Sequence, residues 1–231
     1  MQLFEFLSVL KAPYGMQLLG GIVEMLKLTV LMFVFGFIWG VVLAVLRALP
    51  VRPLRWLIAL YVEYHRNVPL VIQIFIWYFG VPQLLPEGVR FWVNKQPIEF
   101  LFAFIAMSSA FGAYISEDLR SGIRSMDGRQ TEAARALGFS YLSSMFWIVL
   151  PQALRSAAPA IMNQALLFFK STSLAMTIGV VELSYQTRAI QDATYRTFAI
   201  YSVTTLIYLA ISFMLMKAGA RLSKPKWGAG K

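Results

Sequence analysis

Residues 28–46 form a run of 19 amino acids without one charged side chain. At 1.5 Å per residue, a helix of that length covers about 28 Å, close to the ~30 Å hydrocarbon core of a bilayer. Residues 197–216 form a second such run, and the whole chain is 58% hydrophobic and only 14% charged. We therefore predict an all-α integral membrane protein, because backbone exposed to lipid must satisfy its own hydrogen bonds.

Five transmembrane helices are predicted in a single transmembrane domain over residues 1–231. In the first of them Gly36 and Gly40 form a G-x-x-x-G pair, which either admits a neighbouring helix closely or reflects how common glycine is in membrane helices. The sequence leaves both interpretations open. The five predicted crossings are about 20–46, 68–86, 98–116, 152–181 and 197–218.

The stretch 54–86 is too long for one straight crossing, and it carries a glutamate, a histidine and an arginine that would be costly in lipid. We predict an amphipathic helix over 54–66 on the cytoplasmic surface, followed by a bend and then the second crossing. Pro69 supports the bend, because proline lacks a backbone donor and restricts the residue before it.

The distribution of lysine and arginine predicts the orientation. With the N-terminus periplasmic and the C-terminus cytoplasmic, fourteen cations lie on the cytoplasmic side and five outside, as the positive-inside bias requires. The net charge of +10 then needs no nucleic-acid partner. The cytoplasmic cations are Arg47, Arg52, Arg55, Arg66, Arg120, Arg124, Arg129, Arg135, Arg155, Lys217, Arg221, Lys224, Lys226 and Lys231; the external ones are Lys11, Arg90, Lys95, Arg188 and Arg196.

The polar segment 117–151, between the third and fourth crossings, predicts an exposed helical hairpin. Asp127 and Gln130 have the spacing of a capping box, and Gly138 is placed to end that helix in a left-handed conformation. Ser140 can cap a second helix, which we expect Pro151 to terminate.

The same segment resembles a known family. Glu132-Ala133-Ala134, then Gly138 after three residues and Ile148-Val149-Leu150-Pro151 after nine more, is similar to the EAA signature of ABC importer permeases. Arg66–Leu70 and Lys170–Leu174 resemble R-x-x-P-L and K-x-[ST]-[SA]-L elements of the polar amino-acid branch. Residues 66–87 and the tail KPKWGAGK look similar to one permease subunit of glutamate/aspartate importers.

The resemblance implies a type I ABC importer permease fold in the bacterial inner membrane, with a cytoplasmic EAA coupling helix. The implied partners are two ATPase subunits, a second permease subunit (a sibling rather than a copy) and a periplasmic amino-acid-binding protein. This chain would bind no cofactor and catalyse no reaction, since ATP and Mg belong to the ATPase. Its hairpin would move with the ATPase and switch access to the path. The implied coupling residues are Arg129, Gln130, Glu132, Ala133, Ala134, Gly138 and Pro151.

Lys170 is a cation inside a predicted crossing, which makes it a candidate for function. It could attract a substrate carboxylate, or it could pair with an acid or helix-end carbonyl between the two permeases. Ser171, Thr172 and Ser173 add hydroxyls beside it, and Gln73 could face the path or a neighbouring helix. Glu182 and Arg188 fall in a predicted external loop where a binding protein would dock. A separate expectation is an ion pair between Glu24 and Lys27, which are three residues apart on the first helix.

Other functions fit the sequence less well. The terminal GAGK lacks the leading glycine and the Ser/Thr of a phosphate-binding loop. An ATP-independent transporter or channel would leave the EAA segment unexplained, and a membrane enzyme lacks its usual residues, since the chain has one His and no Cys. No metal site is expected. Glutamate/aspartate is the leading substrate, with glutamine or another polar amino acid as the alternative.

Overall fold

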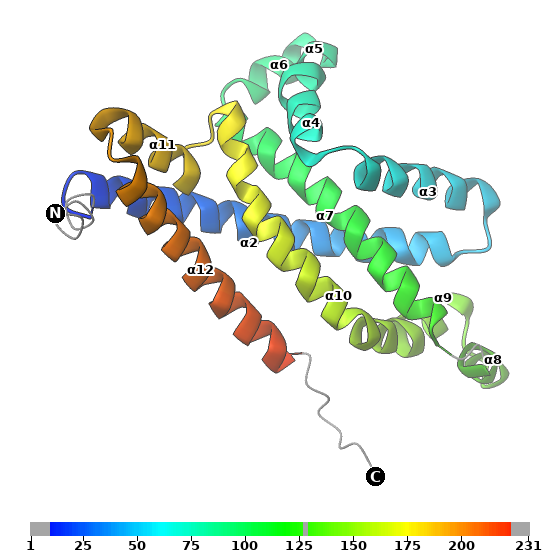
Figure 1. Cartoon of the computed structure of the whole chain (residues 1–231). Coiled ribbons are helices and arrows are strands. Elements are labelled where there is room, and N and C mark those ends of the chain that lie inside the picture. Colours follow the sequence, from blue (N-terminus) through cyan, green and yellow to red (C-terminus); the bar gives the residue numbers. More distant parts are fainter. Residues whose placement is uncertain (1–9, 127–128, 223–231) are drawn as a thin grey trace.

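The computed structural model describes residues 10–126 and 129–222, and every regular element in these ranges is helical (Figure 1). Two short segments, η1 and η2, are π-helices, and η3 is a 3₁₀-helix. The elements are α2 (Tyr14–Ala48), α3 (Arg52–Asn67), α4 (Leu70–Phe75), η1 (Ile76–Gly80), α5 (Val81–Leu84), α6 (Glu87–Val93), α7 (Ile98–Arg124), α8 (Arg129–Ala136), α9 (Tyr141–Ser144), η2 (Met145–Val149), α10 (Leu150–Ser171), η3 (Thr172–Ile178), α11 (Leu183–Thr194) and α12 (Thr197–Leu222).

Four helical segments of the described chain are long and apolar enough to cross a membrane. They are Tyr14–Ala48, Ile98–Arg124, Tyr141–Ile178 and Thr197–Ala220. A fifth arises only if α3 and α4–α5, which meet at 110°, are counted as one broken span. The second predicted crossing therefore does not reach spanning length without α3.

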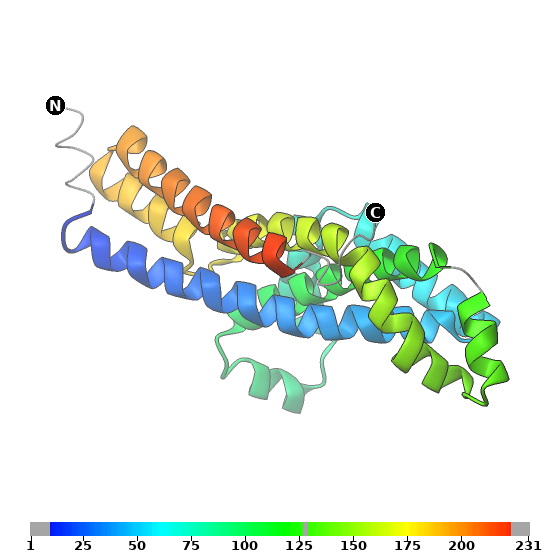
Figure 2. The ribbon, with the colours of Figure 1, turned by 90° about the horizontal axis from the view of Figure 1, so that it is seen from below.

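The glycine pair of α2 packs directly against α7, which decides between the two interpretations left open above. A Cβ on Gly36 would lie 2.9 Å from the Ser108 carbonyl oxygen, and one on Gly40 would lie 2.8 Å from that of Gly112. The main hydrophobic core lies along α7, between α2 and α10. Figure 2 shows α2 extending along most of the molecule, with α11 and α12 running above its N-terminal half.

The break predicted at Pro69 is confirmed, since α3 ends at Asn67 and α4 begins at Leu70. One side of α3 packs into the bundle: Ile58 and Val62 are buried against Leu43 and Ala113. The other side leaves large apolar side chains exposed, among them Trp56 at 78%. The charged side chains of Arg52, Arg55 and Glu63 are exposed on the same helix, so α3 is amphipathic as predicted.

Helix α7 continues beyond the predicted crossing at 98–116 to Arg124, and in this extension Glu117 accepts from Arg47 Nη1 at 2.9 Å and from Arg120 Nε at 2.9 Å. One expectation for the polar segment is wrong. Pro151 does not end a helix but occupies the first turn of α10, directly after η2. The wider π-turn relieves the clash of the proline ring with the preceding turn, and Pro82 follows η1 at the same spacing.

Candidate substrate cavity and coupling region

Helix α8 stands at one end of the bundle, away from α6 and α11 at the other end (Figure 1). It ends as predicted: Gly138 has φ +86°, and the Phe139 N–H donates to the Ala134 carbonyl at 3.1 Å. Ser140 then caps α9 by accepting from the Ser143 N–H at 3.2 Å. The proposed cap Asp127 lies outside the described residues.

The coupling candidates are arranged so that α8 presents a mixed surface. Glu132 is exposed, whereas Ala134 is 2% exposed and holds α8 against η2. Leu137, just before the turn, is 78% exposed, and Trp147 on η2 is 77% exposed. Such apolar exposure on an otherwise polar segment is typical of a contact with another protein. Arg129, Gln130 and Ala133 belong to α8, but their side chains lie outside the described set.

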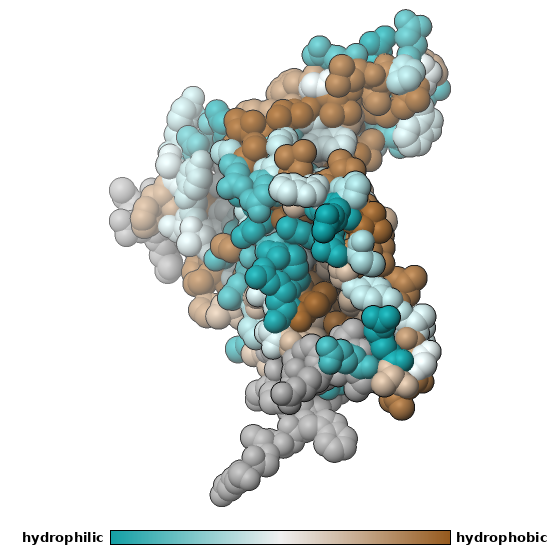
Figure 3. Space-filling view, turned by 90° about the vertical axis from the view of Figure 1, so that its right-hand side faces the viewer, coloured by the Kyte–Doolittle hydropathy of each residue, from teal (hydrophilic) through white to brown (hydrophobic). Residues whose placement is uncertain are grey.

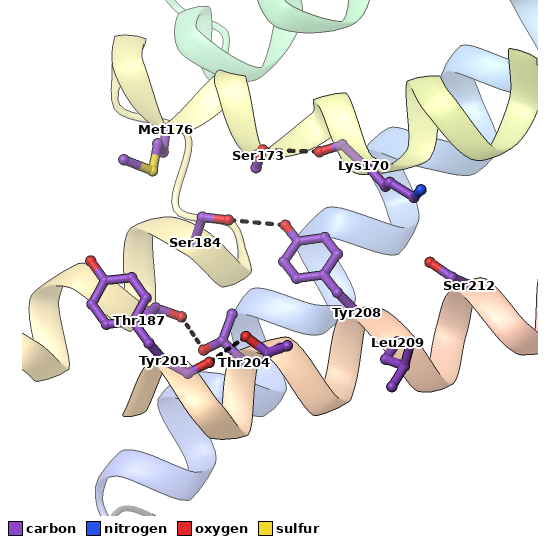
Figure 4. Close-up of a pocket in the computed structure, with 11 residues that line it drawn as sticks. Lys170, Ser173, Met176, Ser184, Thr187, Tyr201, Thr204, Tyr208, Leu209 and Ser212 are labelled. Carbon is purple, nitrogen blue, oxygen red and sulfur yellow. Dashed lines mark hydrogen bonds between the residues drawn. The ribbon is translucent and has the colours of Figure 1, made fainter. Parts of the chain in front are cut away.

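A cavity of about 480 Å³ opens between α10–η3, α11 and α12 (Figure 4). The accessible surface of its lining is mostly apolar, and its polar part consists of one amine and of hydroxyl groups, most of which have hydrogen-bond partners within the protein. Hydroxyl pairs cross it from α11 to α12: Thr187 to Thr204 at 2.7 Å and Ser184 to Tyr208 at 2.9 Å. The lining residues are Lys170, Ser173, Met176, Ser184, Thr187, Tyr201, Thr204, Thr205, Tyr208, Leu209 and Ser212.

The segment around Lys170 divides its side chains between the cavity and the helix itself. Lys170 and Ser173 line the cavity, and Figure 4 shows the amine extending toward the side of α12 that carries Tyr208 and Ser212. The hydroxyl of Thr172 is buried and donates to the Phe169 carbonyl at 2.7 Å, so this residue does not face the cavity. Ser171 likewise donates to its own helix, at the Leu167 carbonyl, and is not part of the lining.

The hydroxyls of α12 escaped the sequence analysis. Tyr201, the adjacent pair Thr204 and Thr205, Tyr208 and Ser212 follow one another at helical spacing in a mostly apolar helix. That spacing places them on one face, so a search for polar periodicity inside the apolar run could have found them.

Gln73 does not face the cavity. It is 1% exposed, and its Nε2 donates to the His65 carbonyl at 3.0 Å and to the Val68 carbonyl at 2.7 Å. These carbonyls lose their helical partners at the Pro69 break. Gln73 therefore stabilises the bend between α3 and α4 and lies outside this cavity, while its assignment to the substrate path stays a prediction.

Glu182 is likewise not an exposed loop residue. It is fully buried at the start of α11 and accepts from the Ser184 and Tyr185 N–H groups at 2.9 and 3.0 Å, as a helix cap does. Tyr208 adds a third hydrogen bond at 3.3 Å. The predicted external loop is thus largely a helix, and its docking candidate Arg188 is exposed on α11.

The protonation of Glu182 gives a pH prediction. Burial raises the pKa of this carboxyl to about 7, outweighing the two backbone donors, while the ordinary value is 4.5. The pKa of Glu182 is higher in the folded than in the unfolded chain, so the buried protonated carboxyl stabilises the folded state. This contribution to the free energy of unfolding is fully present below pH 4.5 and is lost as the pH rises through about 7. We expect the melting temperature of the purified transporter to fall between pH 5 and pH 8, and Glu182→Gln to flatten this slope. Glu87→Gln, at a glutamate whose side chain is 94% exposed, serves as the control. An unchanged slope in Glu182→Gln contradicts the assignment.

The predicted pair of Glu24 and Lys27 is confirmed, with 3.4 Å between the amine and a carboxylate oxygen. The Lys27 amine also lies 4.8 Å from the centre of the Phe100 ring on α7. The ion pair lies within α2, and the contact of the Lys27 amine with the Phe100 ring links α2 to α7.

The four apolar helices of spanning length indicate an integral membrane protein, and the cavity between α10–η3, α11 and α12 is the candidate site for a ligand. Residues 32–226 match the family model for the inner membrane component of binding-protein-dependent transport systems. The chain belongs to this family, and it is the permease subunit of an amino-acid ABC importer.

Individual relatives cover most of the chain. The probable glutamine ABC transporter permease protein GlnM of Bacillus subtilis (strain 168) is 34% identical over 195 residues, which are 84% of this chain and 86% of that protein. The glutamate/aspartate import permease protein GltK of Escherichia coli O157:H7 is 37% identical over 180 residues, 78% and 79% of the two chains. A crystal structure of an amino acid ABC transporter with histidines superposes with a TM-score of 0.80 at 28% identity, covering 95% of this chain and 97% of that one. The fold is therefore the type I ABC importer permease fold.

Proposed function

We propose that this subunit forms half of the path by which a polar amino acid, with glutamate/aspartate the leading candidate, enters the cell. The observation that carries the proposal is the cavity of about 480 Å³, in which the Lys170 amine stands among hydroxyl groups. An amino acid offers a carboxylate to the amine and polar groups to the hydroxyls, and a second carboxylate makes an acidic amino acid the better match.

ATP hydrolysis takes place, in this proposal, on two separate ATPase subunits that hold ATP and Mg. They dock at α8, where the exposed Glu132 and the exposed apolar Leu137 offer a charged and an apolar contact. The N-terminus is periplasmic and the C-terminus cytoplasmic, which places α11 and Arg188 toward a periplasmic binding protein. A sibling permease completes the path.

The test is uptake of labelled glutamate into vesicles that contain this subunit, a partner permease, the ATPase and the binding protein. We expect uptake to require internal ATP and to be blocked by aspartate but not by arginine. Uptake without ATP contradicts the mechanism. ATP-dependent uptake that glutamine alone blocks supports glutamine as the substrate. The similarity to GlnM makes glutamine the second candidate.

Lys170→Met tests the role of the amine. Because one charge-assisted contact contributes about 1.5–3 kcal/mol, we expect uptake to fall roughly tenfold or more. Lys170→Arg keeps the charge and should restore most of the activity, while Lys217→Met makes the same change at an exposed position of α12 and should leave uptake unaltered. Copurification of the ATPase is measured in parallel. Loss of the complex in Lys170→Met indicates instead that the lysine holds the two permeases together.

A further inference from the structure

A second cavity, of about 430 Å³, lies at the end of the bundle that carries α8 and α9. It forms where α2 ends, α3 begins and α7 ends, and η2 closes it on the fourth side. We call it the arginine pocket. Its lining residues are Ala44, Arg47, Ala48, Arg55, Arg120, Ile123, Arg124, Met126, Tyr141, Met145 and Val149.

The arginine pocket carries an excess of positive charge. Glu117 binds both Arg47 and Arg120, and Glu63 of α3 also lies close enough to act on the charge of Arg120. The Arg55 Nε–H donates a hydrogen bond to the Leu49 carbonyl at 2.8 Å, which is an uncharged acceptor. Among the described residues, the carboxylates of Glu117 and Glu63 face four guanidinium groups, so this part of the chain carries an excess of positive charge at the pocket. Such a site suits a phosphate group, which guanidinium binds through paired N–H donors.

The floor of the pocket is apolar, which distinguishes it from a simple anion site. Ala44, Ile123, Met145 and Val149 lie beneath the arginines, and the last two belong to a small buried cluster shared by α2 and α10. The end face of the molecule correspondingly shows hydrophilic side chains gathered between hydrophobic areas (Figure 3). A ligand that combines an anionic head with an apolar tail fits both parts.

The neighbouring surface of α3 is apolar as well. Trp56, Leu57 and Leu60 are 78%, 66% and 70% exposed. Exposed tryptophan and leucine next to arginines, at the end of spanning helices, are typical of the boundary between acyl chains and headgroups. This apolar surface beside the arginines gives the pocket the composition of a headgroup boundary.

We infer that the arginine pocket binds the headgroup phosphate of an anionic phospholipid, with an acyl chain along α3. The inference rests on the orientation in the proposed function, which places this end in the anionic cytoplasmic leaflet. A bound lipid would brace the junction where the Tyr141 hydroxyl donates to the Ala48 carbonyl at 2.5 Å, so it would steady α9 and the turn that leads to α8.

The test is native mass spectrometry of the whole purified transporter with phosphatidylglycerol, with phosphatidylcholine of the same chains, and with inorganic phosphate alone. We expect phosphatidylglycerol to be retained in preference to phosphatidylcholine. The variant Arg55→Gln/Arg124→Gln, which leaves the pairs of Glu117 intact, should retain it about tenfold less. Arg90→Gln/Lys95→Gln removes the same charge near α6 and should behave as the wild type.

Two results overturn the inference: equal retention of the two lipids by the wild type, or undiminished retention by Arg55→Gln/Arg124→Gln. Displacement of phosphatidylglycerol by an equal concentration of inorganic phosphate overturns the lipid assignment in favour of a soluble anion. The lipid assignment is also overturned if, in a lipid-free complex, an acidic segment of the ATPase occupies the arginine pocket. The pocket is then a contact between the two proteins. Uptake in vesicles is measured separately. Loss of the proposed transport function is therefore distinguishable from the absence of lipid in the arginine pocket.

Discussion

Replacing Gly138 with valine is expected to abolish ATP-driven uptake while the spanning helices remain folded. Gly138 has φ +86°, a conformation that β-branched residues strongly disfavour. A Cβ there meets nothing within 4 Å, so the whole effect comes from the backbone rather than from a clash. A change in this turn alters the direction of α8, which we propose as the docking helix. Movement of the ATPase is then no longer transmitted to the spanning helices.

Gly138→Asn is the matched control, because asparagine tolerates the left-handed region far better than valine. Uptake and ATPase activity are measured in vesicles, with the melting temperature as the readout of folding. We expect Gly138→Asn to keep most of the uptake and Gly138→Val to hydrolyse ATP without transport, if it binds the ATPase at all. Equal transport by the two variants contradicts a coupling role for the turn.

Gly40→Leu is expected to disrupt the packing of α2 on α7. A Cβ at this position would lie 2.6 Å from Ile115 Cβ and 2.8 Å from the Gly112 carbonyl oxygen, and the latter belongs to backbone that cannot rotate away. Overpacking of this kind costs about 1–3 kcal/mol or more. Because α2 and α7 form the largest helix contact in the described fold, we expect a melting temperature lower by several degrees and less transporter in the membrane.

The control lies on the same helix. Gly20 is exposed, and a Cβ there has nothing within 4 Å, so Gly20→Leu changes hydrophobicity and helix propensity without a clash. It should melt within about a degree of the wild type or slightly above it, since leucine favours the helix more than glycine. A Gly40→Leu variant as stable as Gly20→Leu means that the helices can separate at little cost.

Features that depend on local physics could be predicted from the sequence. The long apolar runs predicted the spanning helices, Pro69 predicted the break, and Gly138 and Ser140 predicted a helix end and the next helix start. In each case the residue itself restricts the backbone or supplies the hydrogen bond. The family was accessible for a similar reason, because the residues that resemble its signature lie within one contiguous segment.

Features that depend on contacts between distant parts of the chain could not be predicted from the sequence. Nothing near Glu182 in sequence shows that Tyr208, on another helix, buries it, or that Glu117 will meet Arg47 across the bundle and keep α7 helical. The proline at 151 was misinterpreted because the upstream π-turn that accommodates it has no simple sequence signal. The hydroxyl face of α12 is the exception, since its periodicity was present in the sequence.

Helix α2 connects the two ends of this subunit. Near its start a Cβ on Gly21 would lie 2.9 Å from the Leu183 Cα of α11, and at its end the Ala48 carbonyl accepts from Tyr141 of α9. These two contacts are 27 residues apart, about 40 Å along one helix axis. A rotation of such a rod by about 5° displaces one end relative to the other by about 3–4 Å. Because Gly36 and Gly40 hold α2 against α7 along the way, we expect a displacement beside α9 to reach the opposite end through α2 and α7 moving together.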